Sequence, residues 1–298
     1  MNKEKHLVSI GIVSYNNSKG LRLTLECLTK QTYKNLEIIL SDDASPNSEV
    51  EKVALEFQKN DSRIKYIKHK INRGRFFNFN FTLKEATGEY FMWAADDDSW
   101  DKNFVESCVN KLDKNNQYGL VFTKFKLFSN IDKRKVHLNH NLYLKSKYKR
   151  ILFLLLDECS THKANLSYGI WRMSVINKVM EKAISYGINE EHMGKGFDNA
   201  FLTITLGITN IYQVQKTLFT KQYINRLIPG SFRSVKRSIL NNIKHSIKHP
   251  LLHLKKIIVN SKYQINLIRK VYNKPNEKSL EVVFFIKRIL YIIRKYIL

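Results

Sequence analysis

Short apolar runs alternate with amphipathic stretches through the first 100 residues. Residues 7–15 (LVSIGIVSY), 36–41 (LEIILS), 64–69 (IKYIKH) and 89–95 (EYFMWAA) are apolar and rich in β-branched or aromatic side chains, which predicts buried strands. Between them, residues 18–31, 48–60 and 76–86 place apolar side chains at helical spacing, with Ser18 as the predicted cap of the first helix. Strands that alternate with helices in this way predict an α/β fold with a mostly parallel, doubly wound sheet.

Polar residues follow three of these strands at the point where each strand ends. The stretches are SYNN after the first strand, SDDASPN after the second and ADDDSW after the fourth. In open α/β sheets, ligands bind beyond the carboxyl ends of the strands, where the connecting loops converge. The sequence therefore predicts one ligand-binding rim built from three separate loops.

The densest group of acidic residues, Asp96, Asp97 and Asp98, lies on this rim. Adjacent carboxylates repel one another unless a cation or hydrogen-bond donors neutralise them. Asp oxygens suit Mg²⁺ or Mn²⁺, and such sites use one or two protein carboxylates, with substrate phosphates and water completing the coordination. The alternative is a solvated acidic turn in which Asp98 or Asp101 caps the next helix.

Composition and charge fit a globular protein with an anionic ligand. Hydrophobic residues make up 43% of the 298 residues, which excludes a wholly disordered chain. The net charge of +25 would attract nucleic acid, anionic lipid or a phosphorylated small molecule. Cys27, Cys108 and Cys159 form no CxxC pair, so we expect packed, reduced thiols and no zinc site.

The charge is concentrated in the last quarter of the chain. Residues 231–298 hold 16 Lys and Arg against 2 acidic residues, which divides the chain into a body (1–229) and a basic, helical C-terminal region (230–298). Within the segment EVVFFIKRILYIIRKYIL the basic pairs recur at seven residues, which indicates an amphipathic helix on an anionic membrane surface or packed on the body. The N-terminus has no secretory pattern, so we expect a cytoplasmic protein, with the inner face of the cytoplasmic membrane as a candidate contact.

Four stretches together resemble the inverting family 2 glycosyltransferases of the GT-A fold. They are VSIGIVSYNN, LTKQTYKNLEIILSDDASPN, NRGRFFNFNFTLKEATGEYFMWAADDDSW and GFDNAFLTITLGI, which cover roughly residues 7–225 in the family's order. The resemblance implies a Rossmann-like nucleotide-binding half (1–100) and an acceptor-binding half (101–229). It also implies a nucleotide-diphosphate sugar as donor, with a UDP-sugar favoured, and a divalent metal ion.

The resemblance assigns the donor site residue by residue. Tyr15 lines or stacks on the base, with Asn16 beside it; Asp43 hydrogen-bonds the base and Asp42 supports it, although an Asx turn would explain the same two residues. Asn72, Arg73 and Gly74 match a turn that faces the nucleotide, where Arg73 would pair with a phosphate or remain solvated.

In the family's Asp-x-Asp stretch, Ala95 replaces the first carboxylate. Asp97 is then the first choice for the metal ion and Asp98 a further ligand, with Asp96 near the ribose or the metal.

The resemblance also assigns Asp198 as the general base that deprotonates the acceptor hydroxyl. The alternative is that Asp198 is the N-cap of the apolar helix that follows it. His192 is a weaker candidate for a metal or acceptor contact, and Trp171 and Arg172 either frame the acceptor cleft or belong to the core.

The predicted function is therefore transfer of a sugar, with inversion, to a hydroxyl of a glycan or lipid-linked acceptor in surface polysaccharide biosynthesis, with no nucleic-acid partner. Two alternatives remain open at this stage. One is a basic nucleic-acid-binding protein with an inactive α/β body, whose affinity would fall steeply with salt. The other is a nucleotidyltransferase, which would share the metal carboxylates but normally has a Gly-rich phosphate loop after the first strand.

Overall fold

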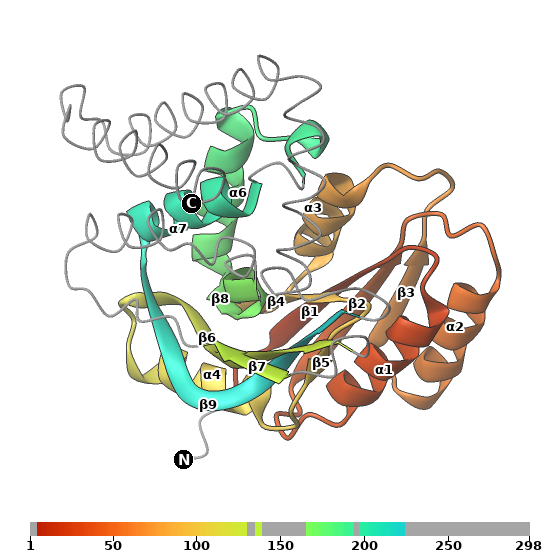
Figure 1. Cartoon of the computed structure of the whole chain (residues 1–298), viewed down its shortest axis with the longest axis horizontal. Helices are drawn as coiled ribbons and strands as arrows, with labels where there is room; N and C mark the ends of the chain where they lie inside the picture. Colours follow the sequence, from red (N-terminus) through yellow and green to blue (C-terminus); the bar gives the residue numbers. More distant parts are fainter. Residues whose placement is uncertain (1–4, 130–134, 139–164, 194–196, 224–298) are drawn as a thin grey trace, which may run out of the picture.

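A computed structural model describes residues 5–129, 135–138, 165–193 and 197–223 (Figure 1). The first part of the chain alternates strands and helices as predicted. Its elements are β1 (Val8–Ser14), α1 (Ser18–Thr29), β2 (Leu36–Asp42), α2 (Glu49–Asn60), β3 (Ile64–Lys68), α3 (Arg75–Glu85) and β4 (Tyr90–Ala95). The four strands lie in the order β3-β2-β1-β4 and all run parallel, which confirms the predicted doubly wound half.

The second part of the chain extends the same sheet with mixed strand directions. Its elements are β5 (Ser99–Trp100), α4 (Phe104–Lys114), β6 (Tyr118–Ser129), β7 (Lys135–Leu138), β8 (Ile170–Arg172), α6 (Met173–Ser185), the short 3-10 helix η2 (Glu190–His192), α7 (Phe197–Ile208) and β9 (Asn210–Tyr223). Strand β8 runs antiparallel to β4 and β6, whereas β6 and β9 run parallel. The described residues thus form one nine-stranded mixed sheet in the order β3-β2-β1-β4-β8-β6-β9-β5, with β7 beside β6.

Helices cover both faces of the sheet. Figure 1 shows α3, α6 and α7 on one side, and α1, α2 and α4 on the other. Strand β4 lies between these layers and is buried along almost its whole length. This explains why its sequence is a continuous apolar run and not an alternating pattern, as is usual for strands covered on both faces.

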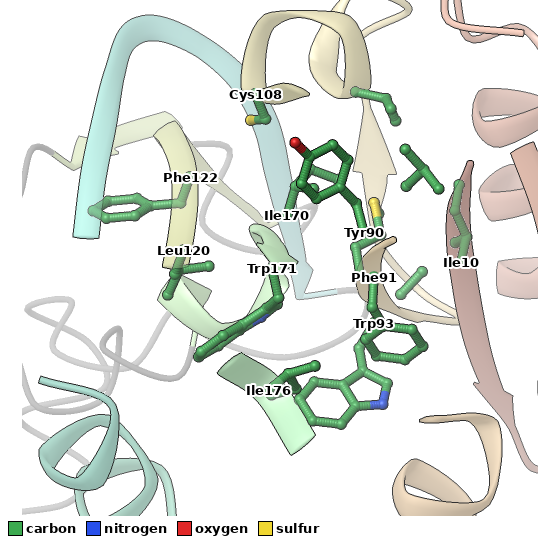
Figure 2. Close-up of a cluster of buried hydrophobic side chains, with 14 of the residues drawn as sticks. Ile10, Tyr90, Phe91, Trp93, Cys108, Leu120, Phe122, Ile170, Trp171 and Ile176 are labelled. Atoms are coloured by element: carbon green, nitrogen blue, oxygen red, sulfur yellow. The ribbon is translucent and has the colours of Figure 1, made fainter. Parts of the chain in front are cut away.

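The core joins the two halves of the molecule around β4 and β8 (Figure 2). Phe91 and Trp93 of β4 meet at an edge-to-face angle of 89°, with ring centroids 5.2 Å apart. Trp171 of β8 is fully buried, and Phe201 of α7 lies 5.8 Å from both tryptophan rings. Trp171 therefore belongs to the core and does not frame a cleft.

One predicted cap needs correction, and two alternative caps are not observed. The cap of α1 is Asn17 and not Ser18, because the Asn17 side chain accepts a hydrogen bond from the backbone N–H of Gly20. Helix α4 has Asn103 at its N-cap, so neither Asp98 nor Asp101 caps it. Asp198 lies inside the first turn of α7 and not at its N-cap.

Arg172 also has a structural role. Its guanidinium donates to the carbonyl oxygens of Tyr118 and Leu112, at the end of α4 and the start of β6. These contacts occupy Arg172 beside the sheet, and it does not line an acceptor cleft.

The predicted basic region 230–298 and the side chain of His192 lie outside the described residues. Among the helices that the structure describes, none combines the length and the apolar character needed to cross a bilayer. Cys27 and Cys108 are free thiols, and Cys108 is fully buried.

Candidate functional site

Asp96 connects the loop after β4 to the loop after β1. One carboxylate oxygen accepts from the Ser14 hydroxyl at 2.7 Å and from the Tyr15 backbone N–H at 3.4 Å, and the other accepts from the Asn17 amide at 3.2 Å. Burial raises the pKa of Asp96 to about 6, against the lowering effect of these hydrogen bonds. Neutral donors therefore hold this carboxylate in place without cancelling its charge.

The N-terminus of α1 approaches the same loop closely. A Cβ atom at Gly20 would lie 2.3 Å from the Asp96 carbonyl oxygen and 2.4 Å from the Asn17 side-chain nitrogen. The Asn17 amide also donates to that carbonyl at 3.1 Å. Position 20 requires glycine because any side chain would push α1 away from the acidic loop Asp96–Asp98.

Asp97 and Asp98 face Lys221, which projects from β9. The Lys221 ammonium lies 2.8 Å from Oδ2 of Asp98 and 3.3 Å from Oδ1 of Asp97. The other Asp98 oxygen, Oδ1, accepts the backbone N–H of Gln222 at 3.1 Å. Because Asp98 is fully buried and uses both oxygens on protein donors, this geometry does not support the expectation that it binds a metal ion.

Asp97 differs from its neighbour in exposure. Its side chain is 24% exposed, whereas that of Asp98 is 0% exposed. The described residues contain no group of three or more His, Cys, Asp or Glu side chains that could enclose a metal ion. A partly exposed carboxylate nevertheless fits a hard cation such as Mg²⁺ or Mn²⁺ that takes most of its ligands from phosphate and water.

The loops after β1 and β2 are tied to each other. The Asn16 backbone N–H donates to the Ser45 hydroxyl at 2.8 Å, and the Asn47 amide donates to Oδ1 of Asn16 at 2.7 Å. Asn16 and Ala44 have φ values of 54° and 60°, in the left-handed region. Tyr15 is left 51% exposed at this rim, which is the exposure that a base-stacking side chain requires.

Asp42 and Asp43 have different tasks although they are adjacent. Asp42 is fully buried and accepts from the Ser45 backbone N–H at 2.9 Å and from the Tyr66 hydroxyl at 3.0 Å. It therefore holds its own loop, as the Asx-turn alternative predicted. Asp43 reaches across to another loop, where its two oxygens accept the backbone N–H groups of Arg73 and Gly74, both at 2.9 Å.

The turn at residues 72–74 is thus fixed by a carboxylate from the neighbouring loop. Gly74 has a φ of 90°. Its backbone N–H also donates to Oδ1 of Asn72 at 3.2 Å. The Arg73 guanidinium stacks on the Phe77 ring, 3.7 Å from its centroid. Its exposed position leaves it accessible to an anion at the rim.

Glu190 of η2 contacts the start of α3 from the second half of the chain. Its carboxylate accepts the backbone N–H of Phe76, and a Cβ atom at Gly74 would lie 2.6 Å from its carboxyl carbon. A carboxylate at a helix N-terminus is stabilised by the unpaired N–H groups and by the helix dipole. Glu190 therefore links the second half of the sheet to the turn that Asp43 holds.

Asp198, Asp97 and Asp98 all lie within electrostatic range of Lys221 and Tyr168. Burial raises the pKa of Asp198, and the positive charges of Arg75 and Lys221 oppose that change. Tyr168 precedes β8, and burial raises the pKa of its hydroxyl group. Four charged side chains also act on this pKa: Lys221, Asp98, Asp198 and Asp97. The core contact of Phe201, one turn along α7, anchors the helix that carries Asp198.

The structure brings together most of the residues predicted from sequence. The backbone and side-chain contacts above connect the loops after β1, β2, β3 and β4. Lys221 contacts the acidic loop, and its charge also acts on Asp198. Sequence reasoning missed Lys221, Glu190 and Tyr168. Each is a single polar residue without a local motif, so no pattern in the sequence marks it.

Comparison with known proteins agrees with this geometry. Residues 9–173, more than half of the chain, match the family model described as Glycosyl transferase family 2. A protein of Rickettsia bellii named as an uncharacterized glycosyltransferase is 33% identical over 162 residues, which is 54% of this chain and 23% of that protein. The Escherichia coli UDP-Glc:alpha-D-GlcNAc-diphosphoundecaprenol beta-1,3-glucosyltransferase WfgD is 32% identical over 127 residues, which is 43% of this chain and 49% of that protein.

The aligned region thus spans less than half of the length of either relative. Among solved structures, Staphylococcus aureus TarS in complex with UDP superposes with a TM-score of 0.55 at 16% identity, covering 91% of this chain and 73% of that one. This similarity shows a shared fold. Taken with the family match, it shows that the chain belongs to glycosyl transferase family 2.

Proposed function

We propose that this protein transfers a sugar from a nucleotide-diphosphate sugar to a hydroxyl group of a glycan or lipid-linked acceptor, with inversion at the anomeric carbon. The observation that carries the proposal is the acidic loop Asp96–Asp98, which lies at the rim of the nucleotide-binding half. Asp97 and Asp98 of this loop and Asp198 all lie within electrostatic range of Tyr168. This arrangement supports a donor site and a candidate base on the two sides of one junction. The family match and the UDP complex of TarS support a nucleotide sugar, and a UDP-sugar is favoured.

On this proposal, the nucleotide lies over the rim formed by the loops after β1, β2 and β3. The exposed Tyr15 lines the base, and Asp43 presents the 72–74 turn to it while Asp42 keeps the loop in place. Arg73, held against Phe77, pairs with a phosphate. Asp96, which its hydrogen bonds hold beside the C-terminal end of β1, faces the ribose.

Asp97 would hold the divalent ion, Mn²⁺ or Mg²⁺, while Asp98 anchors Lys221 and the backbone of Gln222. When bound, such an ion neutralises the charge that develops on the departing diphosphate. Asp198 accepts the proton of the acceptor hydroxyl as that oxygen attacks. Arg75 and Lys221 oppose the effect of burial on Asp198 and so help to keep it ionised and able to act as a base.

The experiment that tests the proposal is a thermal-shift measurement with UDP, GDP and other nucleoside diphosphates, each with and without Mn²⁺. We expect at least one diphosphate, first of all UDP, to raise the melting temperature in the presence of Mn²⁺. Asp97→Asn should remove the Mn²⁺-dependent part of the shift, whereas Asp101→Asn, at an exposed carboxylate just beyond the loop, should leave it unchanged. If no diphosphate stabilises the wild-type protein, the proposed donor is wrong.

The acceptor is proposed from the kind of product that the E. coli relative makes. The printed name of that relative describes glucose transfer to a diphosphoundecaprenol-linked sugar. We therefore propose a lipid-linked or free glycan acceptor in surface polysaccharide biosynthesis at the inner face of the cytoplasmic membrane. Incubation with UDP-glucose and a polyprenyl-diphosphate-linked sugar should give a product one sugar larger. If no product forms with lipid-linked glycans or with free glycans, this acceptor class is wrong.

A further inference from the structure

Lys221 places a positive charge beside Asp97, the carboxylate at which we propose that the divalent cation binds. Its side chain is 17% exposed, and its ammonium contacts Asp98 at 2.8 Å and Asp97 at 3.3 Å. The face of the Tyr168 ring lies 5.6 Å from the same ammonium. The ammonium thus forms an ion pair with both carboxylates and places its positive charge beside Asp97.

The ion pair with Asp98 keeps Lys221 in this place. Asp98 is 0% exposed, and a fully buried carboxylate whose cationic partner leaves is strongly destabilised. Lys221 therefore cannot swing away when another cation approaches Asp97. Its ammonium therefore stays beside the partly exposed Asp97 carboxylate, which we propose as the ligand of the metal ion.

The charges at this point decide how a metal ion can bind. The Lys221 ammonium places its positive charge 3.3 Å from a carboxylate oxygen of Asp97 and 2.8 Å from one of Asp98. A lone divalent cation at Asp97 would be repelled by the ammonium beside it, and this repulsion is strong in a partly buried site. A nucleoside diphosphate brings the negative charge that offsets both cations.

We propose that Lys221 is a positioning residue that makes metal binding depend on the nucleotide. It competes with the divalent ion for Asp97 in the free protein, so the metal ion binds weakly alone and tightly together with the diphosphate. By reciprocity, the diphosphate gains from the metal ion the same factor in affinity that the metal ion gains from the diphosphate. This inference rests on the proposed function, because it needs a donor diphosphate next to Asp97.

The test measures Mn²⁺ binding by the loss of the electron paramagnetic resonance signal of free Mn²⁺, with and without UDP. In the wild type we expect weak binding of Mn²⁺ alone and clearly tighter binding with UDP. Lys221→Gln should raise the affinity for Mn²⁺ alone by about tenfold or more, because it removes a positive charge next to Asp97. The gain in Mn²⁺ affinity on adding UDP should shrink correspondingly.

Two controls separate charge from other effects. Lys216→Gln removes a lysine from an exposed position on the same strand and should leave both Mn²⁺ affinities unchanged. Lys221→Arg keeps the positive charge and should behave as the wild type does. An arginine variant that binds Mn²⁺ alone as tightly as the glutamine variant would overturn the proposal.

Because Lys221→Gln leaves a buried carboxylate without its partner, the protein with this single change could lose its fold. The same step is therefore also made in the background of Asp98→Asn, which removes the buried charge first. The double variant should bind Mn²⁺ alone about tenfold more tightly than Asp98→Asn does. Equal Mn²⁺ affinities in this second pair, with both proteins folded by circular dichroism, would also overturn the proposal.

The outcomes distinguish this inference from the proposed function. If the wild type binds UDP with Mn²⁺ but Lys221→Gln binds Mn²⁺ as the wild type does, the role of Lys221 is wrong and the donor site stands. If the wild type binds no nucleoside diphosphate under any condition, the donor site itself is wrong.

Discussion

The two halves of the molecule hold their acidic side chains by different means. In the nucleotide-binding half, Asp42, Asp43 and Asp96 accept hydrogen bonds from hydroxyl groups, amides and backbone N–H groups. At the junction with the second half, Asp98 is paired with the Lys221 ammonium, and the charges of Arg75 and Lys221 act on Asp198. Neutral donors fix the direction of a carboxylate and leave its charge available, whereas an ammonium also cancels charge.

Under the proposed function, this difference explains how one rim would both recognise a donor and drive a reaction. Recognition needs fixed acceptors for a neutral base and ribose, which the first half has before any ligand arrives. Moving a proton and releasing a diphosphate need charges that respond to one another, and these come together only where the second half packs against the first. The following changes test this division, beginning with the largest expected effect.

Asp198→Asn should separate chemistry from binding most clearly. The amide keeps the size of the side chain but cannot accept the acceptor proton, so we expect kcat to fall by about 100- to 10,000-fold with UDP binding retained. Steady-state kinetics and UDP titration measure the two effects. Glu191→Gln, at an exposed carboxylate of η2, is the matched control. Unchanged turnover in Asp198→Asn would show that Asp198 is not the base.

Asp97→Asn should weaken the metal-dependent step and leave the recognition contacts intact. Loss of the partly exposed carboxylate should lower kcat/KM by about 100-fold at limiting Mn²⁺, an effect of at least the size seen when groups that support metal ligands are removed. Kinetics over a range of Mn²⁺ concentrations check this. A variant with the same Mn²⁺ dependence as Asp101→Asn would show that Asp97 is not the ligand.

Asp96 gives a pH test of the neutral hydrogen-bond network. Burial raises its pKa from 3.8 to about 6, so the folded protein binds this proton more tightly than the unfolded chain does. The free energy of unfolding should therefore fall as pH rises from about 4 to about 6, because the folded state must then ionise a buried group. Between pH 4.5 and 7.5 the contribution of Asp96 should change by roughly 2 kcal/mol.

Urea unfolding of the wild type and of Asp96→Asn at both pH values isolates this contribution. The substitution should be more favourable to stability at pH 7.5 than at pH 4.5. Asp101→Asn serves as the control because its carboxylate is exposed. If the difference between wild type and Asp96→Asn does not vary with pH, the Asp96 carboxyl is not perturbed by burial.

Glu190→Ala should have the smallest effect and would show how firmly the halves are joined. Its loss leaves the Phe76 N–H at the start of α3 without this acceptor, which should reduce the free energy of unfolding by about 1 kcal/mol, as for a lost helix cap. Glu190→Gln, which keeps an acceptor oxygen, should recover part of this loss. Glu191→Ala, at the next residue along the chain and exposed, should leave the unfolding curve unchanged.

The fold of the first half follows closely from its pattern of residues. Buried strands read as apolar runs and their helices as amphipathic stretches, and the predicted elements match the observed ones to within a few residues at their ends. Errors concern single caps, such as Asn17 in place of Ser18, because neighbouring polar residues compete for the same backbone N–H groups. The mixed second half was less predictable, since β8 is only three residues long and its partners are distant in sequence.

Family membership also narrows the functional alternatives. A nucleotidyltransferase and a nucleic-acid-binding protein with an inactive body both fitted the basic composition and the acidic loop. The match over residues 9–173 favours the glycosyltransferase over both. Composition could not make this distinction because net charge reports attraction to anions in general.

The sequence by itself determined the alternation of strands and helices, the rim at the strand ends and the acidic residues upon it, because these depend on local periodicity and on residues close together in the chain. Only the tertiary structure decided which charges meet: Lys221 pairs with Asp98 across 123 residues, and Glu190 reaches the start of α3 across 114. Pairing over such distances leaves no periodic signal, since it arises from how β9 and η2 pack against the first half. The proposed division between a rim for recognition and a junction for chemistry is therefore a property of the packed molecule.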